Sequence, residues 1–272
     1  MIENTLVLLG NPVVPFWQGG KVRACGHSDV GMVRDSNQDS MCVDQSLGLY
    51  LVADGMGGRA GGEVASSLTV QTVATEISEQ LELLQRSDIT ARRNLLSKTV
   101  NSASLKIYER SLELPQYRGM GTTCSLLWIP PPGSKNQKNQ NIAVVAHVGD
   151  SRCYLLRAGL LYQVTDDHSL VNEQLKAGIL KQGDPAISQM RNVITRCVGY
   201  QEEEEVDTFV LQLFENDRFL LCSDGLTGKI PDWEIAEHLA HANFSEIPKT
   251  LVDLANQRGG EDNITVVVVE II

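Results

Sequence analysis

The sequence predicts an α+β fold in which antiparallel sheets pack against pairs of helices. Short apolar runs of strand length follow one another through most of the chain, and several of them end at glycine and aspartate. Two longer segments, roughly 62–84 and 89–112, instead carry apolar residues at the spacing typical of amphipathic helices. Strands in succession with helix pairs inserted between them favour this fold class over a repeating strand–helix–strand unit.

The strand assignments rest on runs rich in Val, Ile and Leu that lie between turn residues. Three short strands are expected between residues 21 and 53, ahead of the two long helices. Beyond these helices, strands are expected at 122–129, 142–148, 151–156, 160–164, 206–213, 218–223 and 264–269. Shorter segments with helical character are expected near 169–177, 232–240 and 247–257.

The chain has no internal repeat and no clear domain break. Its 272 residues are enough to bury one large core. Residues 1–20 contain Asn11-Pro12 and Gly19-Gly20 and show little periodicity. We therefore expect an N-terminal leader over residues 1–20 and a single domain over residues 21–272.

Composition excludes several classes of protein. The net charge of −11 argues against a nucleic-acid-binding surface. The chain has no apolar run long enough to span a membrane and no secretory signal at its start. Its 6 cysteines include no Cys-x-x-Cys pair, which disfavours a zinc site and favours reduced thiols. We expect a monomeric, cytoplasmic protein.

Four of the apolar runs stop or start at an aspartate. The strand that ends at Ala53 leads into Asp54, and those that end at Val148 and Ser223 lead into Gly149-Asp150 and Asp224, whereas Asp262 precedes the last strand. Carboxylates gathered at one end of a sheet repel one another and resist desolvation unless cations are present. The pattern therefore predicts a metal site built from aspartates.

Two of these aspartates are followed by glycine and then by a helix. An Asp-Gly pair after a strand is most often a hairpin turn, in which a second strand returns. After Asp54-Gly55 and Asp224-Gly225 the chain continues as a helix instead. Glycine at these positions leaves the backbone carbonyl open to a ligand or an ion. The two pairs therefore indicate a functional site.

Further motifs accompany these aspartates in a fixed order. They are Arg-Asp-Ser-Asn-Gln-Asp at 34–39, Asp-Gly-Met-Gly-Gly at 54–58, Gly-Met-Gly-Thr-Thr at 119–123, Val-Gly-Asp-Ser-Arg at 148–152, Asp-Gly-Leu at 224–226 and Gly-Glu-Asp-Asn-Ile-Thr at 260–265. The ordered set resembles the metal-dependent protein phosphatases (the PPM family, or type 2C serine/threonine phosphatases), and above all their bacterial members. The resemblance covers roughly residues 22–271.

The resemblance implies a four-layer architecture: a β-sandwich of two antiparallel sheets, flanked by pairs of helices. It also implies a flap beside the active site, corresponding to residues 168–205. The implied activity is hydrolysis of phosphoserine and phosphothreonine in phosphorylated protein substrates, with a role in signalling. In that reaction a water that bridges two Mg²⁺ or Mn²⁺ ions attacks the phosphate, and no covalent enzyme intermediate forms.

The resemblance also implies the ligands of the two ions. Asp54 would bridge both ions, and the backbone carbonyl of Gly55 would bind one of them. Asp39 would contact that same ion, directly or through water. Asp224 and Asp262 would hold the other ion. Oxygen ligands of this kind are those that Mg²⁺ and Mn²⁺ prefer.

Two more residues take roles from the resemblance. Asp150 would belong to a weaker third ion site, in which Asp224 also takes part. Arg34 would hold the substrate phosphate, to which its planar guanidinium can donate two parallel hydrogen bonds. Asn263 lies beside Asp262 in the last motif of the family.

The chain departs from the family pattern at two positions. Met56 stands where eukaryotic relatives carry a histidine that is thought to protonate the leaving group. Water, a metal-bound water or another residue must then supply that proton. Gln38 stands where many relatives carry glutamate. Neither change removes a proposed metal ligand, so we expect activity.

Several other residues have a structural alternative. We expect a structural role for His147, and for His168 either a helix start or substrate contact. Arg196 could contact substrate or anchor its segment. The acidic run Glu202–Glu205 is typical of a solvated loop. The glycines at 57–62 do not have the spacing of a nucleotide-binding P-loop.

Two other functions compete with a phosphatase. One is a phosphatase-like binding module without activity, which would be expected to lack metal aspartates, and none is missing here. The other is a metal-dependent hydrolase of a different phosphoester, such as a nuclease. The acidic composition and the lack of basic or aromatic tracks argue against that activity.

Overall fold

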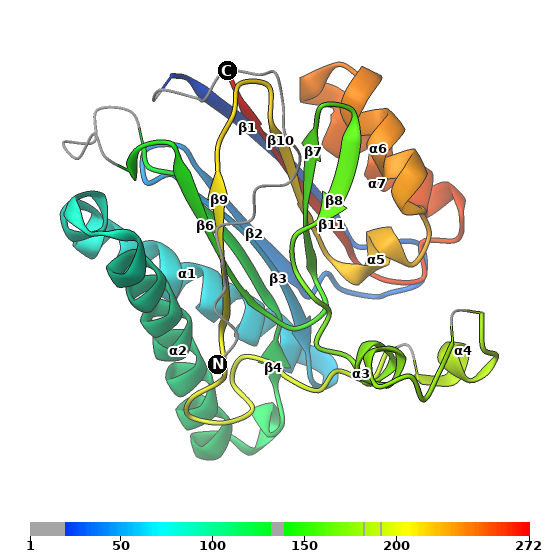
Figure 1. Ribbon diagram of the computed structural model, residues 1–272. Helices are drawn as coiled ribbons and strands as arrows, with labels where there is room; N and C mark the ends of the chain where they lie inside the picture. Colours follow the sequence, from blue (N-terminus) through cyan, green and yellow to red (C-terminus); the bar gives the residue numbers. More distant parts are fainter. Residues whose placement is uncertain (1–19, 132–138, 182, 191) are drawn as a thin grey trace.

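The computed structural model describes residues 20–272 apart from 132–138, 182 and 191. The expected leader over residues 1–20 lies outside the described residues, except for Gly20. In the described residues, strands form two antiparallel sheets packed face to face, with helices on both outer sides (Figure 1). The predicted α+β class and its four layers are confirmed.

The first sheet brings the two ends of the described chain together. Its strand order is β1 (Val22–Asp29), β11 (Ile264–Ile271), β10 (Arg218–Cys222), β7 (Arg152–Arg157) and β8 (Leu160–Gln163). The strand pair β1 and β11 runs in register from Val22 opposite Ile271 to Asp29 opposite Ile264. This pairing fixes the start of β11, and with it the neighbouring Asp262, beside the loop that follows β1.

The second sheet carries the other aspartates. Its strand order is β2 (Asp39–Asp44), β3 (Leu49–Met56), β5 (Cys124–Trp128), β6 (Ile142–Val148) and β9 (Asp207–Gln212), with the short strand β4 (Gly121–Thr122) on β3. In the register of β2 and β3, Asp39 lies opposite Asp54. Asp150 follows β6, where the chain crosses from the second sheet to the first.

Helices cover each sheet on its outer face. The long pair α1 (Gly58–Arg86) and α2 (Ile89–Glu113) covers the second sheet, while α6 (Asp232–His241) and α7 (Ile247–Gln257) cover the first (Figure 1). The shorter helical elements are η1 (Pro115–Tyr117), α3 (Leu170–Lys176), α4 (Ala186–Met190), α5 (Asp224–Thr227) and η3 (Phe244–Glu246).

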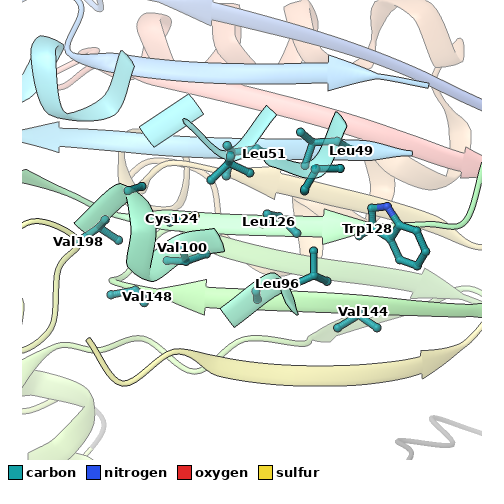
Figure 2. Packing of buried hydrophobic residues seen from close by; sticks show 14 of the residues in the cluster. Leu49, Leu51, Leu96, Val100, Cys124, Leu126, Trp128, Val144, Val148 and Val198 are labelled. Atoms are coloured by element: carbon teal, nitrogen blue, oxygen red, sulfur yellow. The ribbon is translucent and has the colours of Figure 1, made fainter. Parts of the chain in front are cut away.

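Three apolar clusters hold these layers together. One joins α1 and α2 to the second sheet, one fills the space between the sheets, and one joins the first sheet to α6 and α7. Figure 2 shows the first cluster, in which Leu96 of α2 lies beside Leu126 of β5 and Val100 lies nearer Cys124 and Val148. Because the side chains of β5 and β6 are buried on both faces, these strands form continuous apolar runs in the sequence.

The structure differs from the sequence-based expectation at the start of α1. The helix begins at Gly58, ahead of the expected start near Gly62. The start of the helix is closely packed: a Cβ on Gly61 would lie 3.0 Å from Met120 Cβ, and a Cβ on Gly55 would lie 2.1 Å from the carbonyl oxygen of Gly62. A glycine-rich segment that resembles a loop in the sequence is therefore helical, because glycine permits this close contact between helix and strand.

The acidic run Glu202–Glu205 is only partly the solvated loop that composition predicted. Glu202, Glu203 and Glu205 are exposed, but Glu204 is buried. The backbone N–H of Glu204 donates to Asn101 Oδ1 of α2 at 2.8 Å, which holds this part of the run against the helix. Burial raises the pKa of the Glu204 carboxyl.

Candidate metal centre

The structure brings the predicted aspartates together at one end of the sandwich. Asp39 begins β2, Asp54 lies near the end of β3, and Asp150 follows β6. From the first sheet, Asp224 begins α5 directly after β10, and Asp262 precedes β11. The site is therefore assembled from the ends of both sheets.

Burial and mutual repulsion act on these carboxyl groups. Burial is the main cause that raises the pKa of Asp39 and of Asp150, each to about 7. The pKa of Asp54 is raised well above its usual value, first by burial and then by the charges of the neighbouring aspartates Asp39, Asp224, Asp150 and Asp262. Such a cluster cannot carry its full negative charge at neutral pH without cations.

Asp39 is held in place by hydroxyl groups of the opposite sheet. Ser223 Oγ and Thr265 Oγ1 donate to Asp39 Oδ2 at 2.8 and 2.7 Å. The other carboxylate oxygen, Oδ1, is buried and has no hydrogen-bond partner. A buried carboxylate oxygen without a donor is costly, and a cation would satisfy it. This orphaned oxygen indicates that the residues fit a metal ion.

Asp54 is positioned through its backbone by two threonines of the second sheet. Its N–H donates to Thr123 Oγ1 at 2.8 Å, and its carbonyl accepts from Thr122 Oγ1 at 2.8 Å. The hydroxyls of Thr123 and Ser151 are 2.7 Å apart. These bonds connect the turn that carries Asp54 to the turn that carries Asp150.

The carboxylates are close together but are not arranged as a finished cage. Among the described residues, no group of three Asp, Glu, His or Cys side chains already has an arrangement that could hold an ion. Asp262 Oδ2 instead accepts from Arg34 Nη2 at 2.7 Å, and Asp39 Oδ2 is occupied by hydroxyls. The oxygen donors themselves suit a hard divalent cation.

A cavity of about 670 Å³ opens over this cluster. Its lining includes six of the seven predicted site residues: Arg34, Asp54, Gly55, Asp150, Asp224 and Asp262. Asp39, the seventh, lies buried beside them. A smaller cavity of about 270 Å³ adjoins the first and shares Arg34, Asp150, Asp224 and Asp262 with it.

Several residues that support the site were not identified from the sequence. Asn192 lines both cavities. Ser223 and Thr265 act through hydroxyl bonds to Asp39, for which the sequence offers no signal beyond their position beside motif residues. Their role follows only from the way the two sheets face each other.

Asn263 organises the loop that carries Arg34. Its Oδ1 accepts from the N–H of Gln38 at 2.8 Å, and its Nδ2 donates to the carbonyls of Val30 and Ser36 at 2.8 and 3.0 Å. The Gln38 side chain donates to the carbonyl of Gly58 at 3.1 Å. Gln38 therefore contacts the start of α1, a contact that its amide makes without a charge.

The raised pKa values predict how metal-free stability depends on pH. Asp39 and Asp150 have folded-state pKa values of about 7, against 3.8 as the ordinary value, so the folded state binds more protons between these limits. Their contribution to stability is therefore lost as pH rises from about 4 to 7. In EDTA, we expect a higher Tm at about pH 6 than at about pH 8.

Manganese should reverse this trend. Because ions bind the ionised carboxylates, added Mn²⁺ should raise Tm more at about pH 8 than at about pH 6. Thermal unfolding followed by circular dichroism at both pH values, with EDTA or with Mn²⁺, measures the difference. An equal Mn²⁺ effect at the two pH values would contradict the assignment of these carboxylates to an ion site.

Comparison with known proteins yields consistent matches over nearly the whole chain. A model of the protein phosphatase 2C family matches residues 26–264. The serine/threonine phosphatase stp of Listeria monocytogenes serotype 4b (strain F2365) is 37% identical over 247 residues, which cover 89% of this chain and 93% of that protein. Protein phosphatase PhpP of Streptococcus pneumoniae is 36% identical over 250 residues, covering 89% and 94% of the two chains.

Solved structures agree in fold. The Streptococcus agalactiae serine/threonine phosphatase superposes with a TM-score of 0.82 at 34% identity, covering 93% of this chain and all of that chain (100%). The catalytic domain of the serine/threonine phosphatase PstP in complex with two manganese ions gives a TM-score of 0.77 at 32% identity, covering 92% and 97%. The chain belongs to the protein phosphatase 2C family of metal-dependent phosphatases.

Proposed function

We propose that this protein hydrolyses phosphoserine and phosphothreonine in phosphorylated protein substrates with the help of Mg²⁺ or Mn²⁺. The observation that carries the proposal is the cluster of five aspartates beneath a cavity that also exposes Arg34. Relatives named serine/threonine phosphatases, one of them solved with two manganese ions, support it.

The aspartates divide into proposed ion sites. Asp39, Asp54 and the carbonyl of Gly55 would hold one ion, and Asp54, Asp224 and Asp262 the second. Asp150 and Asp224 would hold a third, weaker ion. When bound, such ions lower the pKa of coordinated water and neutralise charge on phosphoryl oxygens. This chemistry requires no cysteine or histidine nucleophile.

Arg34 binds the substrate phosphate in this proposal. Its guanidinium is half-exposed and donates to Asp262, a residue that the second ion would also engage. Because ion and guanidinium compete for the same carboxylate, loading of the site releases Arg34 to donate to phosphate oxygens in the cavity. The planar fork of arginine suits a phosphate dianion better than a lysine does.

The leaving group takes its proton from solvent in this proposal. Met56 lines the cavity and has no proton to give, and none of the described lining residues is a histidine. The cavity is open enough to admit water at the position next to the leaving oxygen. Water supplies the proton that a histidine is thought to supply in eukaryotic relatives.

We also propose a domain organisation, an oligomeric state and a cellular location for the chain. Residues 21–272 form its single catalytic domain, with the 168–205 segment as the flap, and it acts as a cytoplasmic monomer in phosphorylation signalling. Ser169 and Ile194 of this segment line the cavities, which supports the flap assignment. None of the helices in the described part of the chain is long and apolar enough to cross a membrane. The acidic charge supports a protein substrate over a nucleic acid.

Phosphopeptide profiling tests the proposal directly. We expect release of phosphate from phosphoserine and phosphothreonine peptides with Mn²⁺ or Mg²⁺, and none with EDTA. Single-stranded DNA serves as the matched alternative substrate. Cleavage of the DNA without peptide hydrolysis would favour a nuclease, and loss of both reactions would favour a binding module.

Replacing Arg34 with alanine should mainly weaken substrate binding. A charge-assisted hydrogen bond contributes about 1.5–3 kcal/mol, so we expect KM to rise by about 10- to 100-fold with a small change in kcat. Arg34→Lys keeps the positive charge but lacks the planar fork. Its KM should lie between those of the wild type and of Arg34→Ala. Steady-state kinetics on a phosphothreonine peptide measures both constants. A large loss of kcat at unchanged KM would contradict this role.

A further inference from the structure

His168 joins the turn that carries Asp150 to the base of the 168–205 segment. Its backbone N–H donates to the carbonyl of Gly149 at 2.8 Å, and the N–H of Gly149 donates back to His168 Nδ1 at 3.1 Å. On the other side, the N–H of Thr195 donates to the carbonyl of His168 at 2.9 Å. One buried residue therefore holds both segments.

These bonds define the tautomer of His168. Because Nδ1 accepts from a backbone N–H, it carries no proton, and the ring proton of the neutral imidazole is on Nε2. Nε2 lies 3.2 Å from Asp207 Oδ2 and donates to it. The contact is therefore a hydrogen bond from a neutral ring to a carboxylate. This bond is the main cause that lowers the pKa of Asp207, which keeps the carboxylate ionised.

Arg196 completes the connection from the surface. Its Nη1 donates to Asp207 Oδ1 at 3.1 Å, so the two carboxylate oxygens of Asp207 bind Arg196 and His168 separately. Exposure of the side chain increases outward along this path, from 5% at His168 to 29% at Asp207 and 31% at Arg196. A charged residue of the 168–205 segment thus contacts, through two side chains, the backbone beside Asp150.

The backbone of the Gly149–Asp150 turn is restrained from both sides. Gly149 has φ of +107°, and a Cβ there would lie 2.5 Å from Thr123 Cγ2. Thr123 in turn contacts Ser151 and accepts from Asp54. The turn is therefore held on one side by the strand that positions Asp54, and on the other by His168.

We propose that Arg196, Asp207 and His168 form a positioning relay that orients Asp150 for ion binding. The relay rests on the proposed function, in which Asp150 is a ligand of the third, weaker ion. Asp207 fixes the proton on Nε2 of His168. The Nδ1 lone pair then stays available to the Gly149 N–H, and this bond sets the direction of the next residue. At many metal sites a carboxylate likewise fixes the tautomer and orientation of an imidazole by accepting its ring N–H.

Mn²⁺ binding measured by isothermal titration calorimetry on the full chain tests the relay without reference to catalysis. Wild-type protein should show a tight class and a weaker class of ions, and Asp150→Asn should remove the weaker class. Asp207→Asn should lower the affinity of the weaker class by about tenfold and leave the tight class unchanged. Arg196→Met should give a smaller loss, and Arg196→Lys should restore part of it.

The matched control is Asp166→Asn, which removes an exposed carboxylate from the same part of the chain. Asp166 pairs with Lys176 at 3.0 Å, with both side chains more than half exposed. This variant should bind Mn²⁺ as the wild type does. A second readout is amide hydrogen exchange, in which the Gly149 N–H should exchange faster in Asp207→Asn than in the control.

Three results would overturn the relay. The first is a weaker class that is unchanged in Asp207→Asn but absent in Asp150→Asn. The second is an equal loss of affinity in both classes, which a general structural defect would produce. The third is a wild-type chain without any Mn²⁺ class that Asp150→Asn removes. A chain that binds Mn²⁺ as expected but hydrolyses no phosphopeptide would refute the proposed function and leave the relay standing.

Discussion

Asp54→Asn should lower kcat by about a thousandfold or more at saturating Mn²⁺, the largest loss expected from any single substitution in this protein. Asp54 is the proposed bridge between two ions, so its loss affects both at once. Asparagine keeps the size of the side chain and the backbone bonds to Thr122 and Thr123. The variant should therefore fold normally.

Thermal unfolding separates loss of the ion site from loss of the fold. In EDTA, Asp54→Asn should have a Tm equal to or above that of the wild type, because it removes one of several mutually repelling carboxylates. Mn²⁺ should raise Tm less than in the wild type. Asp253→Asn, at an exposed ion pair on α7, is the control. Full activity in Asp54→Asn would refute the assigned bridge.

Asp217→Ala should cost about 3–5 kcal/mol of stability, because it leaves the buried Arg157 without its carboxylate partner. Arg157 and Asp217 are 3% and 1% exposed and share two hydrogen bonds of 2.8 and 2.6 Å. Asp217 Oδ2 also accepts from the N–H of Phe214, which closes the turn between β9 and β10. A fall in Tm of roughly 10 °C is expected for a domain of this size.

The stability of a variant in which both Arg157 and Asp217 are replaced depends on the desolvation cost of the original pair. Burial raises the pKa of Asp217 despite the arginine beside it, so the pairing does not fully offset the desolvation of this carboxyl. The double variant Arg157→Met with Asp217→Leu should therefore recover more than half of the lost stability. Urea unfolding at 25 °C measures each value. Asp253→Ala, which breaks an exposed pair, should cost under about 1 kcal/mol. If Asp217→Ala and Asp253→Ala lost similar amounts of stability, burial of the ion pair would not be what sets the size of the loss.

The fold was predictable wherever the hydrophobic periodicity of a segment and its length indicated the same kind of element. The strands β5 and β6 and the helix α2 have nearly the expected bounds, because continuous burial on both faces of a strand and on one face of a long helix leaves a clear periodicity. The first turn of α1 was not predictable, since its glycines suit a loop equally well. In the structure Gly61 of this turn packs closely against Met120, a tertiary contact that no local pattern encodes.

The aspartates of the site could be predicted from the sequence, but the residues that position them could not. An aspartate at a strand end is visible in the sequence, and so is the order of motifs that groups five of them. The hydroxyls of Ser223 and Thr265 reach Asp39 only because the two sheets face each other. His168 likewise begins no helix, since Ser169 is the residue that caps α3. Its contact with Gly149 depends on how separate segments of the chain pack together, which no local sequence pattern encodes.

The pairing of β1 with β11 has a consequence for the order in which the proposed ion site is assembled. β1 cannot enter its sheet until β11, made almost 250 positions later, has been synthesised, and Val22 then pairs with Ile271. Asp262 takes its place only with that same strand. During translation the earlier aspartates are thus present without Asp262, one of the proposed ion ligands. On the proposed ion assignments, the site can therefore be completed only after β11 has been synthesised.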